Sequence, residues 1–298
     1  MSLIESALER LRRTGDGARD VNTAESRPTA NAGHAVRPSA VVTPMPALEP
    51  PTRQVTVDLA ALRTAGYLPE QLLDRRFADH YRQIKRPLIE AALAGDPQKR
   101  LILVSSALPG DGKTFTCVNL ALSMAHERDL SVLLADGDAP RARLTGLLGM
   151  RGEPGLLNAL ADESLDVESL IVGTNVRGLQ LLPLGKFMEN ATELLASARM
   201  KQIATSLVSR DPRRLVVFDS APLLVSSEAR VLSRLPGQVV LVVRSGKTPV
   251  QAITEALGYL DQNRFRGVIL NHTPLREGGG YYGDYGAGAE EKSHSTAP

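Results

Sequence analysis

One stretch, Leu101 to Phe115, constrains the fold more than any other part of the sequence. It begins with four apolar residues, Leu101–Val104, a run of the length expected for a buried strand. A turn that contains two glycines follows, and then Phe115, Val118 and Leu122 recur at the spacing of one helix face. A strand, a glycine-rich turn and a helix in immediate succession predict that the turn lies at the carboxyl end of a strand and opens a helix.

The turn carries the groups that bind a triphosphate. Gly110 and Gly112 leave backbone N–H groups uncovered, and the helix start adds positive potential. Lys113 can reach the outer phosphates, and the Thr114 hydroxyl can ligate Mg²⁺. The usual pattern is G-x-x-x-x-G-K-[S/T], and here Ala107 replaces its first glycine. We interpret the stretch as a phosphate-binding loop, the alternative being a glycine-rich turn with an incidental lysine; the expected nucleotide-binding residues are Pro109, Gly110, Asp111, Gly112, Lys113, Thr114, Phe115 and, from a later strand end, Asn271.

Three aspartates end later apolar runs. Asp136 and Asp138 follow residues 131–135, and Asp219 follows residues 215–218. Beside a bound magnesium nucleotide, one carboxylate can hold the metal while another accepts a proton from an attacking hydroxyl. An aspartate after a strand is also a common helix-start residue, so this interpretation depends on the three occurring together with the loop. The expected catalytic residues are Lys113, Asp136, Asp138 and Asp219, and the expected metal ligands are Thr114, Asp136 and Asp219.

Apolar runs of strand length alternate with helical patterns between residues 101 and 271. This alternation predicts an α/β fold with a mostly parallel sheet and helices on both faces. Further strands are expected at 131–135, 179–182, 215–218, 239–243 and 267–270, and one long helix at 193–208. Ligands of such sheets bind where strands end. We therefore expect one sheet edge to hold the residues at these strand ends, which are Ser105, Asp136, Asp219 and Asn271.

Composition and charge argue against several other classes of function. A net charge of +2 over 298 residues gives no overall reason to expect a nucleic-acid partner. The single cysteine, Cys117, cannot form an internal disulfide, and we expect it to serve packing in a reducing cytosol. No apolar run approaches the roughly 18–20 residues of a membrane span, and the N-terminus does not have the pattern of a secretory signal. We expect a cytoplasmic protein that reaches the membrane only through a partner.

The sequence divides into four parts. Residues 1–13 have the pattern of an amphipathic helix, 14–54 of a disordered linker, 55–275 of a globular domain, and 276–298 of a flexible tail rich in glycine and tyrosine. The first helix is expected either to recognise a partner or to fold back on the domain. Within the domain, a spacing of three places opposite charges along one helix face, which is either an ordinary solvated face or a subunit contact. The charged residues of this face are Asp79, Arg82 and Lys85.

The tail holds three of the six tyrosines of the chain, Tyr281, Tyr282 and Tyr285, where no apolar core can use them. The ten residues from Asn271 to Tyr281 can extend up to about 33 Å. A tail tyrosine can therefore reach the phosphate loop of its own chain or of a neighbour, the alternative being an inert or merely adhesive tail.

Together these motifs resemble one family. The segments S-S-A-L-P-G-D-G-K-T at 105–114, D-G-D at 136–138 and V-V-F-D-S-A-P-L-L at 216–224, with the terminal tyrosines, resemble the bacterial tyrosine kinases, or BY-kinases, of capsule and exopolysaccharide loci. The likeness is greatest to the cytoplasmic, CpsD/CapB-like autokinases of exopolysaccharide or exosortase loci. It implies a P-loop NTPase fold and ATP- and Mg²⁺-dependent autophosphorylation at Tyr281, Tyr282 and Tyr285.

The resemblance also implies an assembly. In that family one subunit's tail enters the site of another, and Asp79, Arg82 and Lys85 occupy the place of the family's Glu-x-x-Arg-x-x-Arg contact motif. Arg141 lies one position later than the arginine that often follows the family's second aspartate. Relatives of this kind work with a separate membrane polysaccharide co-polymerase that activates them.

Two other functions are compatible with the fold. A ParA/MinD-type ATPase shares it, but such proteins carry K-G-G-x-G-K-[S/T], and Leu108 occupies the position of their first lysine. A non-catalytic scaffold that binds nucleotide and supports polysaccharide export is the second alternative.

Overall fold

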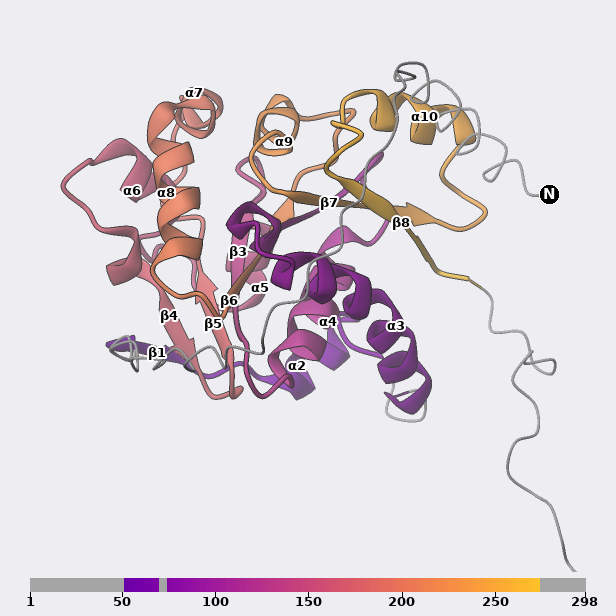
Figure 1. Ribbon diagram of the computed structural model, residues 1–298, viewed down its shortest axis with the longest axis horizontal. Helices are drawn as coiled ribbons and strands as arrows, with labels where there is room; N and C mark the ends of the chain where they lie inside the picture. Colours follow the sequence, from indigo (N-terminus) through magenta and orange to yellow (C-terminus); the bar gives the residue numbers. More distant parts are fainter. Residues whose placement is uncertain (1–50, 70–73, 274–298) are drawn as a thin grey trace, which may run out of the picture.

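A computed structural model describes residues 51–69 and 74–273, which form an eight-stranded sheet with helices on both faces (Figure 1). In chain order the strands are β1 (Arg53–Val55), β2 (Leu101–Ser106), β3 (Ser131–Gly137), β4 (Val172–Thr174), β5 (Leu179–Leu182), β6 (Arg214–Ser220), β7 (Gln238–Arg244) and β8 (Phe265–Asn271). Across the sheet the order is β1-β4-β5-β3-β6-β2-β7-β8. Every neighbouring pair is parallel except β4 and β5. The predicted α/β class with a mostly parallel sheet is thus confirmed.

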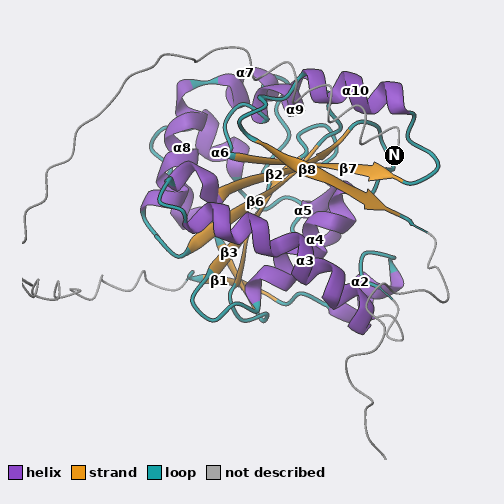
Figure 2. Ribbon diagram, turned by 45° about the vertical axis from the view of Figure 1, so that its right-hand side comes forward, coloured by secondary structure: helices purple, strands orange, loops and turns teal. Residues whose placement is uncertain are grey.

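Two hydrophobic clusters, one on each face, hold the layers together. The α-helices are α2 (Leu59–Thr64), α3 (Asp74–Leu93), α4 (Lys113–Ala125), α5 (Arg143–Leu147), α6 (Leu156–Ala161), α7 (Ala191–Ala196), α8 (Ala198–Ser209), α9 (Ser227–Leu232) and α10 (Val250–Gly258), and the short 3₁₀ turns are η2 (Pro97–Arg100) and η3 (Val167–Leu170). Helices α2 to α5 pack on one face and α6 to α10 on the other (Figure 2).

The central strands are buried on both sides, which explains why they appear in the sequence as continuous apolar runs. In β2, Leu101 and Leu103 belong to the cluster under α6 to α10, whereas Ile102 and Val104 belong to the cluster under α2 to α5. This alternation has the period of two that a strand imposes. All six residues of β2 are buried, so the loop that follows it starts from a fixed point.

The structure differs from the sequence-based expectation in several elements. The single helix expected at 193–208 is two helices, α7 and α8, because Ser197 takes an extended conformation and its side chain accepts a hydrogen bond from Met200 N to cap α8. The three-residue strands β1 and β4 were not predicted, and the sheet begins at Arg53, slightly before the expected domain start. The predicted N-terminal helix, most of the linker and the three tail tyrosines lie outside the described residues. Among the described helices, none combines the length and the apolar character that a bilayer crossing requires.

Candidate active site

The predicted phosphate-binding loop joins β2 to α4, and its glycines adopt backbone conformations that other residues rarely take. Gly110 and Gly112 have φ values of +87° and +98°, and Gly112 lies immediately before the first residue of α4, Lys113. A Cβ atom on Gly112 would lie 1.9 Å from the side-chain nitrogen of Asn271. The backbone angle therefore favours glycine at position 112, and any larger residue would also have to displace the Asn271 side chain.

Asp111 fastens this loop to two other strand ends. Its carboxylate accepts hydrogen bonds from the backbone N–H of Leu108 at 3.0 Å and from Thr248 Oγ1 at 2.6 Å, and its carbonyl oxygen accepts one from Asn271 Nδ2 at 3.0 Å. The Asp111 side chain is buried. In the structure, Asp111 and Asn271 thus brace the loop between the ends of β7 and β8, which the sequence pattern alone did not indicate.

Asp136 and Asp219 are direct neighbours in the sheet, because they are register partners on the parallel strands β3 and β6. Asp136 Oδ2 accepts hydrogen bonds from the backbone N–H and the hydroxyl of Thr145, both at 2.7 Å, and its Oδ1 accepts one from Asp138 N at 3.0 Å. Burial raises the Asp136 pKa, and these hydrogen bonds oppose the rise. Asp136 therefore shapes the turn that presents Asp138, and any metal contact must use its remaining lone pairs.

Asp219 is fully buried and has no such support. Burial raises its pKa to about 7, and the positive charge of Lys113 opposes this rise. The Thr114 hydroxyl lies near the Asp219 carboxylate and also opposes the rise in its pKa. Nevertheless, neither Thr114 Oγ1 nor either carboxylate oxygen of Asp219 has a hydrogen-bond partner of ordinary geometry within the described residues.

Lys113 and Asp138 form an ion pair, with 3.2 Å between Lys113 Nζ and Asp138 Oδ2. Both side chains are largely buried, and the second carboxylate oxygen of Asp138 has no partner within the described residues. Buried polar atoms without partners are uncommon in native structures. Four of them lie together here, namely Thr114 Oγ1, Asp138 Oδ1, Asp219 Oδ1 and Asp219 Oδ2.

These four oxygens are the donor type that Mg²⁺ prefers. Among the described residues, no group of three His, Cys, Asp or Glu side chains is arranged to hold a metal by itself. Mg²⁺ usually takes only one or two protein carboxylates and completes its shell with water and phosphate oxygens. The donor set therefore fits a magnesium ion that arrives with a nucleotide.

A small cavity of about 170 Å³ opens over the loop. Besides loop residues 109, 110 and 112–115 it is lined by Tyr67, Arg141, Arg143 and Pro222. The residue between the two arginines, Ala142, has φ 44° and ψ 45°, a left-handed conformation that is uncommon for a residue other than glycine. Both arginines are exposed, and neither makes a salt bridge or a side-chain hydrogen bond within the described part of the chain.

Sequence reasoning did not assign a role to Tyr67 or Arg143. Arg143 lies seven positions after Asp136 in the turn that Asp136 shapes, so its charge was the only available signal. Tyr67 comes from a segment far from the motifs, and no sequence pattern connects it to the loop.

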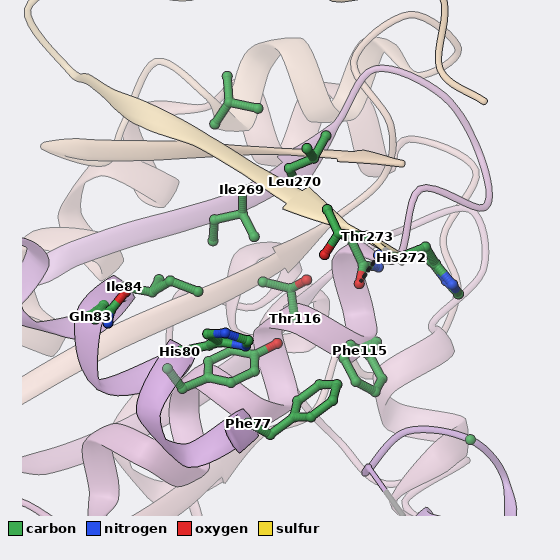
Figure 3. A pocket seen from close by; sticks show the side chains of 14 residues that line it. Phe77, His80, Gln83, Ile84, Phe115, Thr116, Ile269, Leu270, His272 and Thr273 are labelled. Atoms are coloured by element: carbon green, nitrogen blue, oxygen red, sulfur yellow. Dashed lines mark hydrogen bonds between the residues drawn. The ribbon is translucent and has the colours of Figure 1, made fainter. Parts of the chain in front are cut away.

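A larger cavity of about 670 Å³ adjoins the start of α4 on the side of β8 (Figure 3). The aromatic side chains of Phe77 and Phe115 contact each other in an edge-to-face arrangement on one wall. Asn271 and His272 contribute from the end of β8. Phe115 lines both cavities, so the two lie next to each other at the start of α4.

The three charged residues expected on one face of α3 do not share one environment. Asp79 and Arg82 pair with each other on the surface, and more than half of each side chain is exposed. Lys85 is buried, donates a hydrogen bond to Ser123 O at 2.6 Å and pairs with Glu127 at 2.9 Å. Lys85 therefore ties α3 to α4 within the same chain. Cys117 is fully buried, as predicted, and burial raises its pKa well above the usual range.

Comparison with known proteins places the chain in a family. No protein-family model matches it. The tyrosine-protein kinase YwqD of Bacillus subtilis (strain 168) is 30% identical over 210 residues, which are 69% of this chain and 86% of YwqD. The chain belongs to the bacterial tyrosine-protein kinases. This family membership confirms the resemblance stated from the sequence motifs.

Other matches agree with this assignment. The tyrosine-protein kinase wzc of Salmonella typhimurium is 33% identical to this kinase over 193 residues, and the match spans 63% of this chain but only 26% of wzc. Among solved structures, the kinase domain of Escherichia coli tyrosine kinase ETK matches with a TM-score of 0.60 at 28% identity, over 71% of this chain and 81% of that one. The BceF tyrosine kinase domain matches with a TM-score of 0.58 at 29% identity, over 74% and 92% of the two chains.

Proposed function

We propose that this kinase transfers the γ-phosphoryl group of ATP to its own C-terminal tyrosines, Tyr281, Tyr282 and Tyr285, and that this autophosphorylation regulates the synthesis or export of an exopolysaccharide. The observation that carries the proposal is the convergence of Lys113 with the unpartnered oxygens of Thr114, Asp138 and Asp219 beneath a cavity over the loop. These are the groups that phosphoryl transfer needs.

The nucleotide lies across both cavities. Its phosphates occupy the small cavity, where backbone N–H groups of residues 110–114 and the start of α4 provide positive potential. Its base extends past Phe115 into the larger cavity, where Phe77 and His272 supply further walls. Thr114 and Asp219, with the remaining lone pairs of Asp136, hold Mg²⁺, which when bound neutralises phosphate charge.

Asp138 accepts the proton of the attacking tyrosine. A free phenol has a pKa of about 10 and needs a base near neutral pH. The phenolic oxygen bonds to the γ-phosphorus, the bond to the β–γ bridging oxygen breaks, ADP leaves, and the proton passes to Asp138. Lys113 moves from Asp138 to the phosphates when ATP enters, which frees the carboxylate and stabilises the charge on the transferring group.

Within a homo-oligomer, the active site of one subunit phosphorylates the tail tyrosines of another. The exposed residues Asp79 and Arg82 are best placed to form the contact between subunits. The activating partner is a membrane polysaccharide co-polymerase, which holds this cytoplasmic chain at the inner membrane. Phosphorylation adds about −1.5 to −2 charges per tyrosine. The accumulated charge weakens tail docking and loosens the assembly, so the oligomer is expected to sediment more slowly after incubation with ATP.

Incubation with γ-labelled ATP and Mg²⁺, followed by mapping of the label, tests this function. The kinase proposal expects label on residues 277–292, which trypsin releases as one peptide with all three tail tyrosines. Release of inorganic phosphate without label on protein would support the ParA/MinD-type ATPase, and neither product would support the scaffold. Lys113→Ala should lower the rate of labelling at least about 100-fold, and labelling near the wild-type rate would contradict the assigned site.

A further inference from the structure

Three cationic side chains line the small cavity over the phosphate-binding loop, and they differ in their partners. Lys113 pairs with Asp138. Arg141 and Arg143 are exposed, and neither makes a side-chain hydrogen bond or an ion pair with any residue that the structure describes. The guanidinium group carries a fork of N–H donors that matches a carboxylate. Both arginines are therefore available to an anionic group that enters the cavity.

We propose that Arg141 and Arg143 bind the carboxylate of Asp284 in the incoming tail and thereby position its neighbouring tyrosines for phosphorylation. The inference rests on the proposed kinase function and deepens it, because it names the residues that select the acceptor segment. Asp284 lies between Tyr282 and Tyr285, and it is the only charged residue between positions 278 and 289. The acceptor segment thus offers a single carboxylate for the arginines to recognise.

The two arginines stand on the turn that carries the proposed base. The N–H of Arg141 donates to Asp138 O at 3.0 Å, and Arg143 is the first residue of α5. Thr145 of the same helix donates to Asp136 Oδ2 from its N–H and from its hydroxyl, both at 2.7 Å. The turn is thus tied to the end of β3 at both of its ends. A carboxylate bound by the arginines is therefore held at a fixed place relative to the base.

The tail begins at the edge of the sheet that holds this cavity. Strand β8 ends at Asn271, whose side chain donates to Asp111 O in the loop at 3.0 Å, and the described chain ends two residues later at Thr273. Asp284 follows Thr273 by eleven positions, which span at most about 36–40 Å. Its carboxylate is therefore within reach of the cavity of its own chain and of a neighbouring subunit that lies against this edge.

The spacing within the tail suits recognition at this place. In an extended chain, residues two positions apart lie on the same side. Tyr282 precedes Asp284 by two positions, and Tyr285 follows it directly. A carboxylate held at the arginines therefore brings Tyr282 to the side of the cavity, where its phenol can approach Asp138.

Charge gives the reason why an acidic acceptor needs these arginines. Asp284 enters beside the phosphates of ATP and the carboxylate of Asp138, and these negative groups repel it. Two guanidinium groups offset that repulsion for one carboxylate. Three phosphotyrosines bring about −4.5 to −6 charges in total, far more than two arginines neutralise, so the phosphorylated tail is still expected to leave the site.

A double-mutant cycle on the full chain tests the pairing. The proteins are the wild type, Asp284→Asn, the double variant Arg141→Gln with Arg143→Gln, and the combination of all three substitutions. Each is incubated with saturating γ-labelled ATP and Mg²⁺, and the initial rate of label in tryptic peptide 277–292 is measured. We expect Asp284→Asn and the arginine double variant each to lower this rate at least about fivefold. The combined variant should lie within about twofold of either, because both changes remove the same contact.

Three controls separate tail binding from nucleotide binding and from folding. The calorimetric affinity for ATP should stay within about threefold of wild type in every variant. Arg141→Lys with Arg143→Lys keeps both charges and should label the tail at least about twofold faster than the glutamine pair. Arg151→Gln changes an exposed arginine that does not line the cavity, so it should keep the wild-type rate.

The other outcomes overturn the inference. An unchanged rate in Asp284→Asn, or losses that multiply in the combined variant, would mean that the arginines do not bind this carboxylate. A loss of ATP affinity beyond threefold in the arginine double variant, with no effect of Asp284→Asn, would assign the arginines to the nucleotide instead. If the wild-type protein leaves peptide 277–292 unlabelled, the kinase proposal itself is wrong. If the wild type and all variants label it at equal rates, the kinase proposal stands and only the pairing is wrong.

Discussion

Lys113 Nζ lies 3.2 Å from Asp138 Oδ2, so the loop lysine neutralises the proposed base in the absence of nucleotide. The lysine has to exchange one anionic partner for another when ATP enters, and the exchange leaves Asp138 ready to accept a proton. The site therefore couples binding of the first substrate to activation of the group that serves the second.

This coupling predicts that substitutions of Lys113 and of Asp138 affect ATP binding and the labelling rate differently. Lys113→Ala should lower the rate of tail labelling at least about 100-fold and also weaken ATP binding, because it removes a cation that contacts the phosphates. Asp138→Asn should lower the labelling rate by a similar factor while ATP binding stays within about threefold, since general base catalysis contributes roughly 10²–10⁴-fold. Nucleotide titration and initial labelling rates measure both quantities. A large loss of ATP affinity in Asp138→Asn would argue against its assignment as the base.

The two loop glycines should tolerate alanine unequally. Gly112→Ala should abolish ATP binding, because its Cβ would collide with the Asn271 side chain in addition to the unfavourable φ. Gly110 has a similar φ, but a Cβ atom added to it would meet nothing within 4 Å. Gly110→Ala is therefore the matched control, and it should lower the free energy of unfolding by only about 1 kcal/mol. Asn271→Ala combined with Gly112→Ala should restore part of the binding. No restoration would mean that the contact with Asn271 is not the cause.

Asp219 should make the stability of the kinase depend on pH. Its pKa is raised from 3.8 to about 7 in the folded chain, so between these values the folded state binds more protons than the unfolded state. The cost of burying this carboxylate is therefore absent below about pH 4 and complete above about pH 7. Asp219→Asn should stabilise the ligand-free protein more at pH 8 than at pH 5, by about 2–3 kcal/mol.

Urea unfolding at the two pH values measures this difference. Asp129→Asn, at an exposed position, is the matched control for the substitution itself. An equal effect of Asp219→Asn at both pH values would contradict a raised pKa at this residue.

Substitutions of the charged residues of α3 should affect stability to different extents. Lys85→Met removes a buried ammonium from Ser123 O and Glu127 and should lower the free energy of unfolding by about 1–3 kcal/mol. Arg82→Ala removes an exposed ion pair and should change stability by less than about 1 kcal/mol, while it reduces the assembly observed by sedimentation. If Arg82→Ala leaves the assembly intact, the proposed subunit contact is wrong.

Features that depend on residues close together in the sequence were predictable, whereas contacts between distant segments were not. The strands that carry Asp136 and Asp219 were predictable, because buried parallel strands appear as apolar runs and the aspartates end them. Their direct pairing in the sheet follows from strand order, which the sequence pattern did not specify. The position of Lys85 was not predictable either, since a spacing of three describes a helix face but not what packs against it.

Contacts between distant segments account for the rest. The carboxylate of Asp111 meets Thr248, 137 residues later, and Asn271 meets the loop from 160 residues away. Tyr67 lines the cavity, and its carbonyl oxygen accepts a hydrogen bond from the side chain of Asn119, 52 residues later. No local sequence pattern encodes these contacts. The loop, its lysine and the three aspartates are local motifs, and all were found from the sequence.

The central claim is that Thr114 and Asp219 hold a magnesium ion on the phosphates of ATP that Lys113 binds. Calorimetric titration with ATP, with and without Mg²⁺, tests it most directly. The wild-type chain should bind ATP at least about tenfold more tightly with Mg²⁺, a difference of about 1.4 kcal/mol. Thr114→Val and Asp219→Asn should lose this difference, and Lys113→Ala should bind weakly under both conditions. Failure of the wild-type chain to bind ATP, or a magnesium effect that persists in both Thr114→Val and Asp219→Asn, would contradict the account.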